Sequence, residues 1–154
     1  MLHVIPQDLV KEAQIMELLS QHAHPNIVRY HGCRVRRNRL VGIVLDRHPN
    51  TLTSYLKNTN TSQSQNQSQV GGMHLNKIQF MQRLESAIQH LHSLNLAHND
   101  LNPDNTLVNK SGMPVLIDFG STRVIGTKLG TSRGTKGWMD RGRDEGLPHV
   151  GSGP

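Results

Sequence analysis

Two short apolar runs that a tight turn can join constrain the local fold more than any other feature of this sequence. Residues 106–108 and 115–117 are β-type runs, and the turn-forming residues between them include Gly112, which is free to adopt a positive φ. The pattern predicts an antiparallel hairpin. Asn105 directly precedes its first strand and Asp118 directly follows its second, so both side chains emerge at the open end, where paired backbones lie about 5 Å apart.

A third oxygen-bearing side chain approaches the same end of the predicted hairpin. Asp100 lies in a segment restrained by Pro103 and by the turn formers Asn102 and Asp104. Three oxygen-bearing side chains suit a hard cation such as Mg²⁺, with one carboxylate left to handle a proton or a hydroxyl. For either acidic piece taken alone, the simpler interpretation is a loop carboxylate that caps a turn.

Composition narrows the class of protein. The chain has 154 residues with 34% hydrophobic content, which is enough for one ordinary domain with a buried core. Aromatic residues make up only 3%, so surfaces that stack on RNA bases are scarce. The net charge of +6 is compatible with phosphate-rich partners, but a solvated basic surface explains it as well. The basic residues are scattered apart from one predicted hairpin tip, which holds Arg34, Arg36, Arg37 and Arg39.

Cysteine and histidine usage disfavours disulfides and zinc. Cys33 is the only cysteine, which excludes an internal disulfide and a multi-thiolate zinc site and fits a reducing compartment. The histidines show no HExxH spacing. The N-terminus lacks the apolar run of a signal peptide, and no stretch approaches a membrane span. We therefore expect a cytoplasmic or nuclear protein that does not bind membranes.

Hydrophobic periodicity predicts the remaining elements. They are a helix over 8–19, an antiparallel strand pair over 27–35 and 40–46, a short helix over 51–57 with Thr51 as a possible cap, and a long helix over 75–94. Residues 58–72 are almost entirely polar and predict a disordered insertion, and residues 141–154 predict an irregular tail. On the long helix, the stripe expected to face the core comprises Leu75, Ile78, Met81, Leu84, Ile88 and Leu91.

The two polar clusters together resemble a known family. The segment from His98 to Asn105, HNDLNPDN, resembles the protein-kinase catalytic loop HRDLxxxN, and Asp118-Phe119-Gly120 resembles the DFG motif that follows it. The upstream helix, HPNIV and the strand pair also occur in the family's order, so the resemblance covers roughly residues 8 to 140. It implies an α+β fold, a partial two-lobed kinase-like domain over residues 1–140.

The resemblance implies roles for the loop residues. Asp100 would be the catalytic base that orients the acceptor hydroxyl, and Asn105 and Asp118 would hold Mg²⁺ against the phosphates of ATP. Asn102, which we assign to the catalytic loop with Asp100, stands where a lysine is expected near the transferred phosphate. A positive charge is thereby absent where negative charge must be stabilised.

The resemblance also implies the nucleotide-binding residues. Leu45 would be the gatekeeper, the backbone groups of Asp46 and His48 would meet adenine, and Leu107 would lie beneath the ring. Glu12 would be the helix glutamate that pairs with a strand lysine, although an ordinary exposed helix charge is nearly as good an interpretation.

Other positions depart from the family pattern. Asn99 replaces the arginine that commonly reads a phosphorylated activation loop, which disfavours control by that route. No glycine-rich loop and no suitable lysine precede Glu12, and Asp140-Arg141-Gly142 follow GTKGWM where APE is expected, so we expect a truncated fragment or an incomplete gene model. Phosphorylation sites are expected in the activation segment, at Thr131, Ser132 and Thr135. His98 and Phe119 would be packing residues under the site.

The sequence therefore predicts a serine/threonine protein kinase-like transferase that uses ATP and Mg²⁺ and acts on a protein hydroxyl. Two alternatives stay open. One is a catalytically impaired, pseudokinase-like regulatory module, which the missing glycine loop and lysine favour. The other is a small-molecule phosphotransferase of the aminoglycoside-kinase type. Nucleic acid is the least favoured partner, and the sequence does not predict the oligomeric state.

Overall fold

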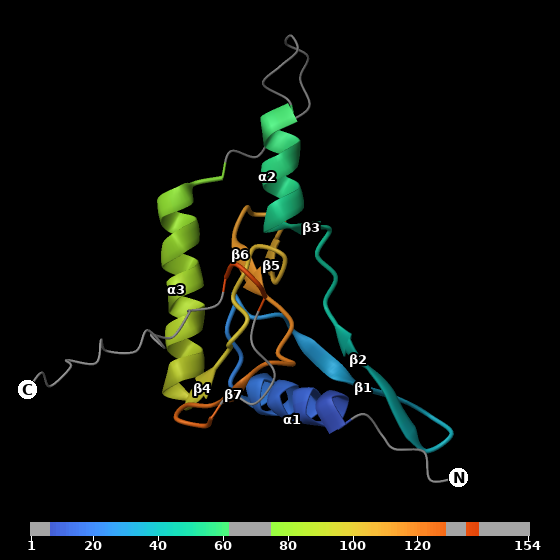
Figure 1. The fold of residues 1–154 in the computed structure, drawn as a ribbon. Helices are drawn as coiled ribbons and strands as arrows, with labels where there is room; N and C mark the ends of the chain where they lie inside the picture. Colours follow the sequence, from blue (N-terminus) through green and yellow to red (C-terminus); the bar gives the residue numbers. More distant parts are fainter. Residues whose placement is uncertain (1–6, 62–74, 129–134, 139–154) are drawn as a thin grey trace, which may run out of the picture.

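The computed structural model describes residues 7–61, 75–128 and 135–138 (Figure 1). Predictions for residues 62–72 and 141–154, and for Thr131 and Ser132, lie outside the described residues. In chain order the elements are α1 (Gln7–Gln21), β1 (Tyr30–Arg36), β2 (Arg39–Leu45), β3 (Asn50–Thr51), α2 (Leu52–Thr61), α3 (Lys77–Ser93), β4 (Leu96–Ala97), β5 (Thr106–Val108), β6 (Pro114–Leu116) and β7 (Arg123–Val124).

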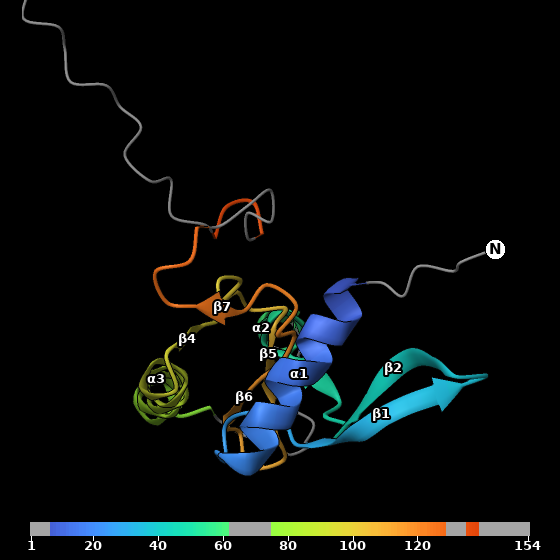
Figure 2. The same cartoon turned by 90° about the horizontal axis from the view of Figure 1, so that it is seen from below.

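The strands form small antiparallel sheets, and both predicted hairpins are confirmed. β1 pairs with β2, β5 lies between β3 and β6, and β4 pairs with β7. In the β5–β6 hairpin, Thr106 pairs with Leu116 and Val108 with Pro114, so β6 begins one residue earlier than predicted. Seen from below, α1 lies between α3 and the β1–β2 pair (Figure 2).

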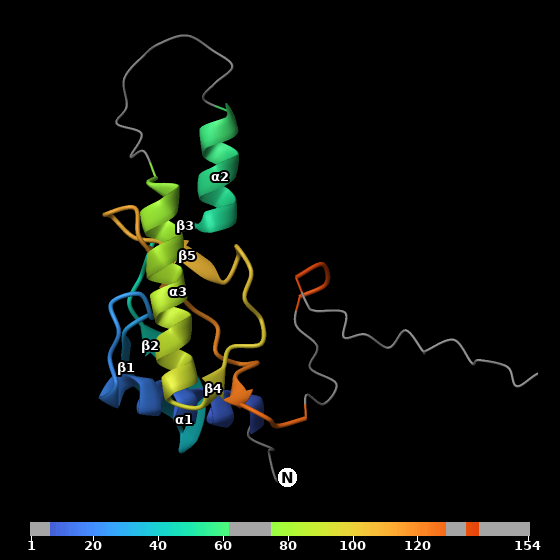
Figure 3. The same ribbon diagram turned by 90° about the vertical axis from the view of Figure 1, so that its left-hand side faces the viewer.

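The core-facing stripe predicted for α3 is wrong in its N-terminal half. Ile78 is 73% exposed and Met81 is 60% exposed, whereas the buried residues of this helix are Phe80, Leu84, Ala87 and Leu91. Apolar residues three and four apart form two overlapping stripes on α3. The stripe that faces the core is the one that contains the large aromatic side chain of Phe80. Figure 3 shows α2 near the N-terminal end of α3 and α1 near its C-terminal end.

The second helix is longer than predicted. The polar insertion was expected to begin at residue 58, but α2 continues to Thr61. Its start is capped, because Thr51 Oγ1 accepts a 3.1 Å hydrogen bond from the backbone N–H of Ser54. Once the first turn is fixed, each added residue brings its own backbone hydrogen bond, so polar residues can extend the helix. None of the helices in the described ranges is long and apolar enough to cross a membrane.

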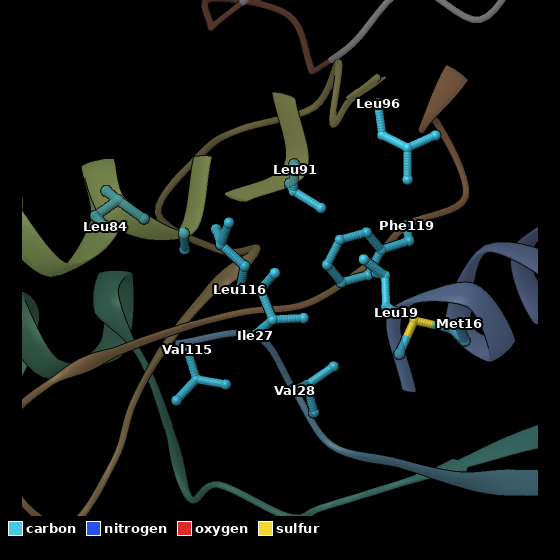
Figure 4. Packing of buried hydrophobic residues seen from close by; sticks show 11 residues of the cluster. Met16, Leu19, Ile27, Val28, Leu84, Leu91, Leu96, Val115, Leu116 and Phe119 are labelled. Carbon is cyan, nitrogen blue, oxygen red and sulfur yellow. The ribbon is translucent and has the colours of Figure 1, made fainter. Parts of the chain in front are cut away.

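One hydrophobic core joins α1 and α3 to the β5–β6 hairpin (Figure 4). Ile27 and Val28 were predicted to start a strand, but β1 begins only at Tyr30. They run parallel to β6 instead, where Ile27 forms an isolated bridge with Leu116 and Val28 N–H donates to the Leu116 carbonyl at 3.0 Å. Leu116 and Phe119 are 0% and 1% exposed, so the hairpin and the residues directly after it are anchored in the core.

Candidate active site

Asn105 and Asp118 lie at the open end of the hairpin, one before β5 and the other after β6. Ile117 N–H donates to the Asn105 carbonyl at 3.1 Å, which extends the β5–β6 register and brings Asn105 beside the start of the Asp118 segment. The Asn105 side-chain amide donates to the carbonyl and to Oδ2 of Asp100, both at 3.0 Å. Within the described part of the chain no group donates to Asn105 Oδ1. That oxygen is therefore available at the mouth of the hairpin.

Asp118 lies in an unusual backbone conformation that turns the chain sharply after the hairpin. Its φ is 62°, in the left-handed region that costs a non-glycine residue on the order of 1 kcal/mol. Its side chain is exposed, and Oδ1 accepts a 3.3 Å hydrogen bond from Gly120 N–H. No described group donates to Oδ2. The carboxylate therefore keeps a free oxygen facing solvent.

Asp100 is the most heavily hydrogen-bonded carboxylate of the site. Its Oδ1 accepts from the Thr135 N–H and hydroxyl, both at 2.7 Å, and from the Asn102 amide at 3.2 Å, while Asn105 donates to Oδ2. Burial by itself raises the pKa of Asp100, but these hydrogen bonds outweigh it and hold the pKa below the ordinary value. The carboxylate is thus ionised at neutral pH and fixed in direction.

Asn102 organises the loop around Asp100. It is 4% exposed, and its amide nitrogen donates to the Asp100 carbonyl, to Asp100 Oδ1 and to Thr135 Oγ1 at 3.0–3.2 Å. Its Oδ1 accepts from the N–H groups of Asp104 and Asn105. Every polar atom of the side chain is used inside the protein, which favours a positioning role over direct contact with a phosphate.

His98 and Phe119 pack beneath the site as predicted. Their ring centroids are 5.1 Å apart in an edge-to-face arrangement, and both residues are buried. His98 Nε2–H donates to the Ile117 carbonyl at 2.9 Å, and Nδ1 accepts from Asp100 N–H at 3.3 Å. Burial lowers the pKa of His98 in spite of that backbone bond and the nearby carboxylates. A neutral imidazole therefore ties the Asp100 loop to the segment before Asp118.

Glu12 reaches the site from α1. A methyl group on Gly120 would lie 3.3 Å from Asp118 Oδ1 and 3.9 Å from Glu12 Oε2, so both carboxylates lie close to Gly120. Burial and the negative charge of Asp118 raise the pKa of Glu12, while a hydrogen bond from the backbone of Phe119 opposes them. No lysine or arginine of the described residues forms a salt bridge with Glu12.

The predicted adenine-binding residues lie at the end of β2, just after it, and in β5. Leu45 ends β2 and Leu107 is central in β5, and both pack partly buried against the core. Asp46 N–H is already used by the Arg29 carbonyl at 3.0 Å, which leaves the Asp46 carbonyl as the group open to a ligand.

Asp46 and His48 also face a different part of the molecule. They line a cavity of about 600 Å³, whose other walls include Leu19, Tyr30 and Val115. The lining of this cavity contains none of the oxygen-bearing residues of the hairpin mouth. The structure thus joins Asp100, Asn102 and Asn105 by hydrogen bonds, whereas Asp118 lies after the other strand of the hairpin, and none of the four lines the cavity of Asp46 and His48.

Two residues contribute more than the sequence indicated. Thr135 was predicted only as a phosphorylation site, yet it contacts Asp100 across 35 residues of sequence. Asn99 was interpreted as the loss of an arginine, yet its amide donates to the carbonyls of Ala97 and Ser121, both at 3.1 Å. The GTKGW stretch was the available signal for Thr135, whereas nothing local pointed to the contacts of Asn99.

A family model for the protein kinase domain matches residues 3–140. The chain belongs to the protein kinase family. Among curated relatives, it is 31% identical over 129 residues to the serine/threonine-protein kinase/endoribonuclease IRE1 of Hypocrea jecorina, and 31% identical over 144 residues to IRE2 of Homo sapiens. It is 29% identical over 129 residues to mitogen-activated protein kinase kinase kinase 5 of Arabidopsis thaliana.

These matches cover most of this chain and little of the relatives. They take in 75%, 84% and 82% of this chain, but 10%, 14% and 17% of the respective relatives. Among solved structures, the yeast RNA Pol II CTD kinase CTDK-1 complex contains a chain that matches with a TM-score of 0.62 at 21% identity, covering 82% of this chain and 38% of that one. The likeness confirms the partial kinase fold. Protein kinases use ATP, usually with Mg²⁺.

Proposed function

We propose that this chain carries the catalytic loop and the metal-binding hairpin of a serine/threonine protein kinase and supports phosphoryl transfer from ATP to a protein hydroxyl. One observation carries the proposal. The Asp100 carboxylate is oriented by hydrogen bonds from three residues, Asn102, Asn105 and Thr135, beside a hairpin mouth where Asn105 and Asp118 keep free oxygens.

The residues divide into roles that their surroundings support. Asp100, ionised and fixed, orients the acceptor hydroxyl and accepts its proton, in keeping with the base of the kinase loop. Asn105 Oδ1 and Asp118 fit the oxygen ligand set of Mg²⁺, which when bound supplies positive charge against the nucleotide phosphates. Asn102 and His98 position the loop. Little covalent chemistry remains for the protein, because phosphoryl transfer depends mainly on placement and charge.

The nucleotide base would lie between Leu45 and Leu107, with the backbone of Asp46 and His48 at its edge. The partial burial of both leucines against the core supports a pre-formed apolar floor. A protein acceptor is favoured over a small molecule by HPNIV and GTKGW, and by the contact that Thr135 of GTKGW makes with Asp100.

A regulatory module without turnover is the second candidate, and Glu12 is the observation that favours it. The Glu12 carboxylate has no cationic partner within the described residues and faces Asp118 instead, with a raised pKa. A lysine at this place would neutralise both carboxylates and draw a nucleotide phosphate toward them. For a protein with no lysine at this place, we expect weaker nucleotide binding and slower transfer.

The full chain incubated with MgATP and casein separates these candidates. We expect transfer by the wild type and a loss of about 10²-fold or more in Asp100→Asn and Asp118→Asn, the range for removal of a catalytic base or a charge-stabilising group. Asp104→Asn is the matched control, since Asp104 is an exposed carboxylate of the same loop. Phosphate transfer that survives Asp118→Asn would rule out the proposed kinase mechanism. Nucleotide binding without any phosphate transfer would support the regulatory module.

A further inference from the structure

The antiparallel pairing of β4 with β7 joins the segment before Asp100 to the segment after Asp118. β4 pairs with β7 through Leu96 and Val124 and through Ala97 and Arg123. One position before this pair, Ile125 N–H donates to the Asn95 carbonyl at 3.0 Å. The segment that leads to Asp100 and the segment that follows Asp118 are therefore aligned antiparallel.

Asn99 continues this register by its side chain. Extending the β4–β7 pairing by two residues places Asn99 opposite Ser121, and the Asn99 amide donates to the Ser121 carbonyl at 3.1 Å. The backbone cannot continue the ladder here, because Asn99 turns into the left-handed region with φ 64°. A second bond from the same amide to the Ala97 carbonyl, also 3.1 Å, fixes the side chain's orientation.

We propose that Asn99 is a positioning residue that sets the placement of Asp100 relative to Asp118, and that it does so with a neutral amide rather than through a phosphate on the following segment. The role assigned to those carboxylates rests on the proposed function. Asn99 directly precedes Asp100, and Ser121 lies three residues after Asp118. The amide thus joins the two halves of the site across 22 residues of sequence.

The residue type suits this task. Asparagine tolerates a left-handed backbone better than most residues and offers two amide N–H groups, which match the two carbonyls. The nearby cation is also used locally, since the Arg123 guanidinium donates to the Gly120 carbonyl at 3.0 Å and to the Thr122 carbonyl at 2.7 Å. Both polar side chains at this junction therefore hold backbone carbonyls.

Native-state hydrogen exchange on the full chain tests the bridge without any need for activity. The reporters are Ile125 N–H, bonded to Asn95, and Thr122 N–H, bonded to Phe119 at 3.0 Å. Asn99→Gly keeps the positive φ and removes both donors, and exchange at both reporters is expected to rise at least about fivefold, the factor for one lost hydrogen bond.

The matched control is Asn95→Gly. Asn95 has a φ of 59°, and its side chain forms no hydrogen bond with a described residue, so the reporters should exchange as in the wild type. Equal exchange in Asn99→Gly and wild type would overturn the proposal. So would loss of protection at Thr122 and Ile125 after phosphatase treatment of the wild-type chain, because the bridge would then need a phosphate.

A kinetic measurement separates positioning from general stability. If the chain transfers phosphate, Asn99→Gly should lower kcat about tenfold with less than about twofold change in KM for MgATP, while Asn95→Gly leaves both unchanged. An equal kcat in wild type and Asn99→Gly overturns the positioning role. If the wild type shows no transfer at all, the proposed function fails and the exchange experiment still decides the role of Asn99.

Discussion

Thr135 donates twice to one oxygen of Asp100: its backbone N–H and its hydroxyl each lie 2.7 Å from Oδ1. Two short bonds from one residue to one carboxylate oxygen stabilise its ionised form. They also join the segment at 135 to the catalytic loop. A change at Thr135 would therefore alter the hydrogen bonding of Asp100, the proposed catalytic base.

Removing the Thr135 hydroxyl should raise the pKa of Asp100. Thr135→Val loses one of the donors to Oδ1, so the pKa moves up toward the ordinary aspartate value near 3.9. Thr135→Ser keeps both donors and should behave as the wild type. A ¹³C NMR titration of the Asp100 carboxyl measures this, and an identical midpoint in Thr135→Val and wild type would show that the hydroxyl bond does not form in solution.

Replacing Glu12 by glutamine should stabilise the chain at neutral pH. The pKa of Glu12 is raised in the folded state, so its ionised form opposes folding above that pKa, and the penalty fades as the pH falls toward the unfolded value near 4.3. Glu12→Gln keeps an acceptor for the Phe119 backbone. We expect a gain of less than about 1 kcal/mol at pH 7, because the group is partly solvated, and none near pH 4.

Urea unfolding of the wild type and of Glu12→Gln at pH 4 and pH 7 measures the difference in their free energies of unfolding. Glu17→Gln serves as the control, because Glu17 is an exposed carboxylate on the same helix. A loss of stability in Glu12→Gln at pH 7 would mean that Glu12 is paired with a cation rather than set against Asp118.

Adding one methyl group at Gly120 should disturb Asp118 specifically. The new Cβ would lie 3.3 Å from Asp118 Oδ1, closer than an ordinary contact, so the carboxylate must shift. We expect Gly120→Ala to weaken magnesium-dependent nucleotide binding about tenfold, comparable to the loss of one good ligand contact. Gly42→Ala is the control, since nothing lies within 4 Å of its added Cβ. Unchanged affinity in Gly120→Ala would place Asp118 outside the nucleotide site.

Two buried threonines should respond oppositely to replacement by valine. Thr122 is 2% exposed, and its hydroxyl has no hydrogen-bond partner in the described part of the chain, so Thr122→Val removes a buried unsatisfied group. Thr106 is equally buried, but its hydroxyl donates to the Asn102 carbonyl at 3.1 Å. Urea unfolding should show Thr122→Val more stable and Thr106→Val less stable, each by about 1 kcal/mol. A destabilised Thr122→Val would indicate an acceptor for its hydroxyl.

The features of the site that the sequence predicted correctly are those that depend on residues close together in the chain. The β5–β6 hairpin follows from two apolar runs and a turn, and the positions of Asn105 and Asp118 at its mouth follow from strand register. The contact of Thr135 with Asp100 depends on where a distant segment returns, which no periodicity encodes. The Asn99 bridge likewise depends on the β4–β7 pairing of two-residue strands, which are too short to leave a pattern.

The errors on the helices have a similar origin. Spacing alone places Ile78 and Phe80 on α3 equally well, and only the shape of the core selects Phe80 for burial. The last residues of α2 are polar, and their polarity did not predict that the helix would extend to Thr61. The extension is possible because, once the first turn is capped, each further residue adds a backbone hydrogen bond. In both cases tertiary context decided what the local pattern left open.

The most direct test of the account is calorimetric titration of the full chain with ATP, with and without Mg²⁺. We predict saturable binding that needs Mg²⁺, weakened at least about tenfold in Asp118→Asn and in Asn105→Ala and unchanged in Asp104→Asn. Binding of equal strength without Mg²⁺, or in Asp118→Asn, would contradict the claim that the mouth of the β5–β6 hairpin gathers the metal-binding oxygens of a kinase site.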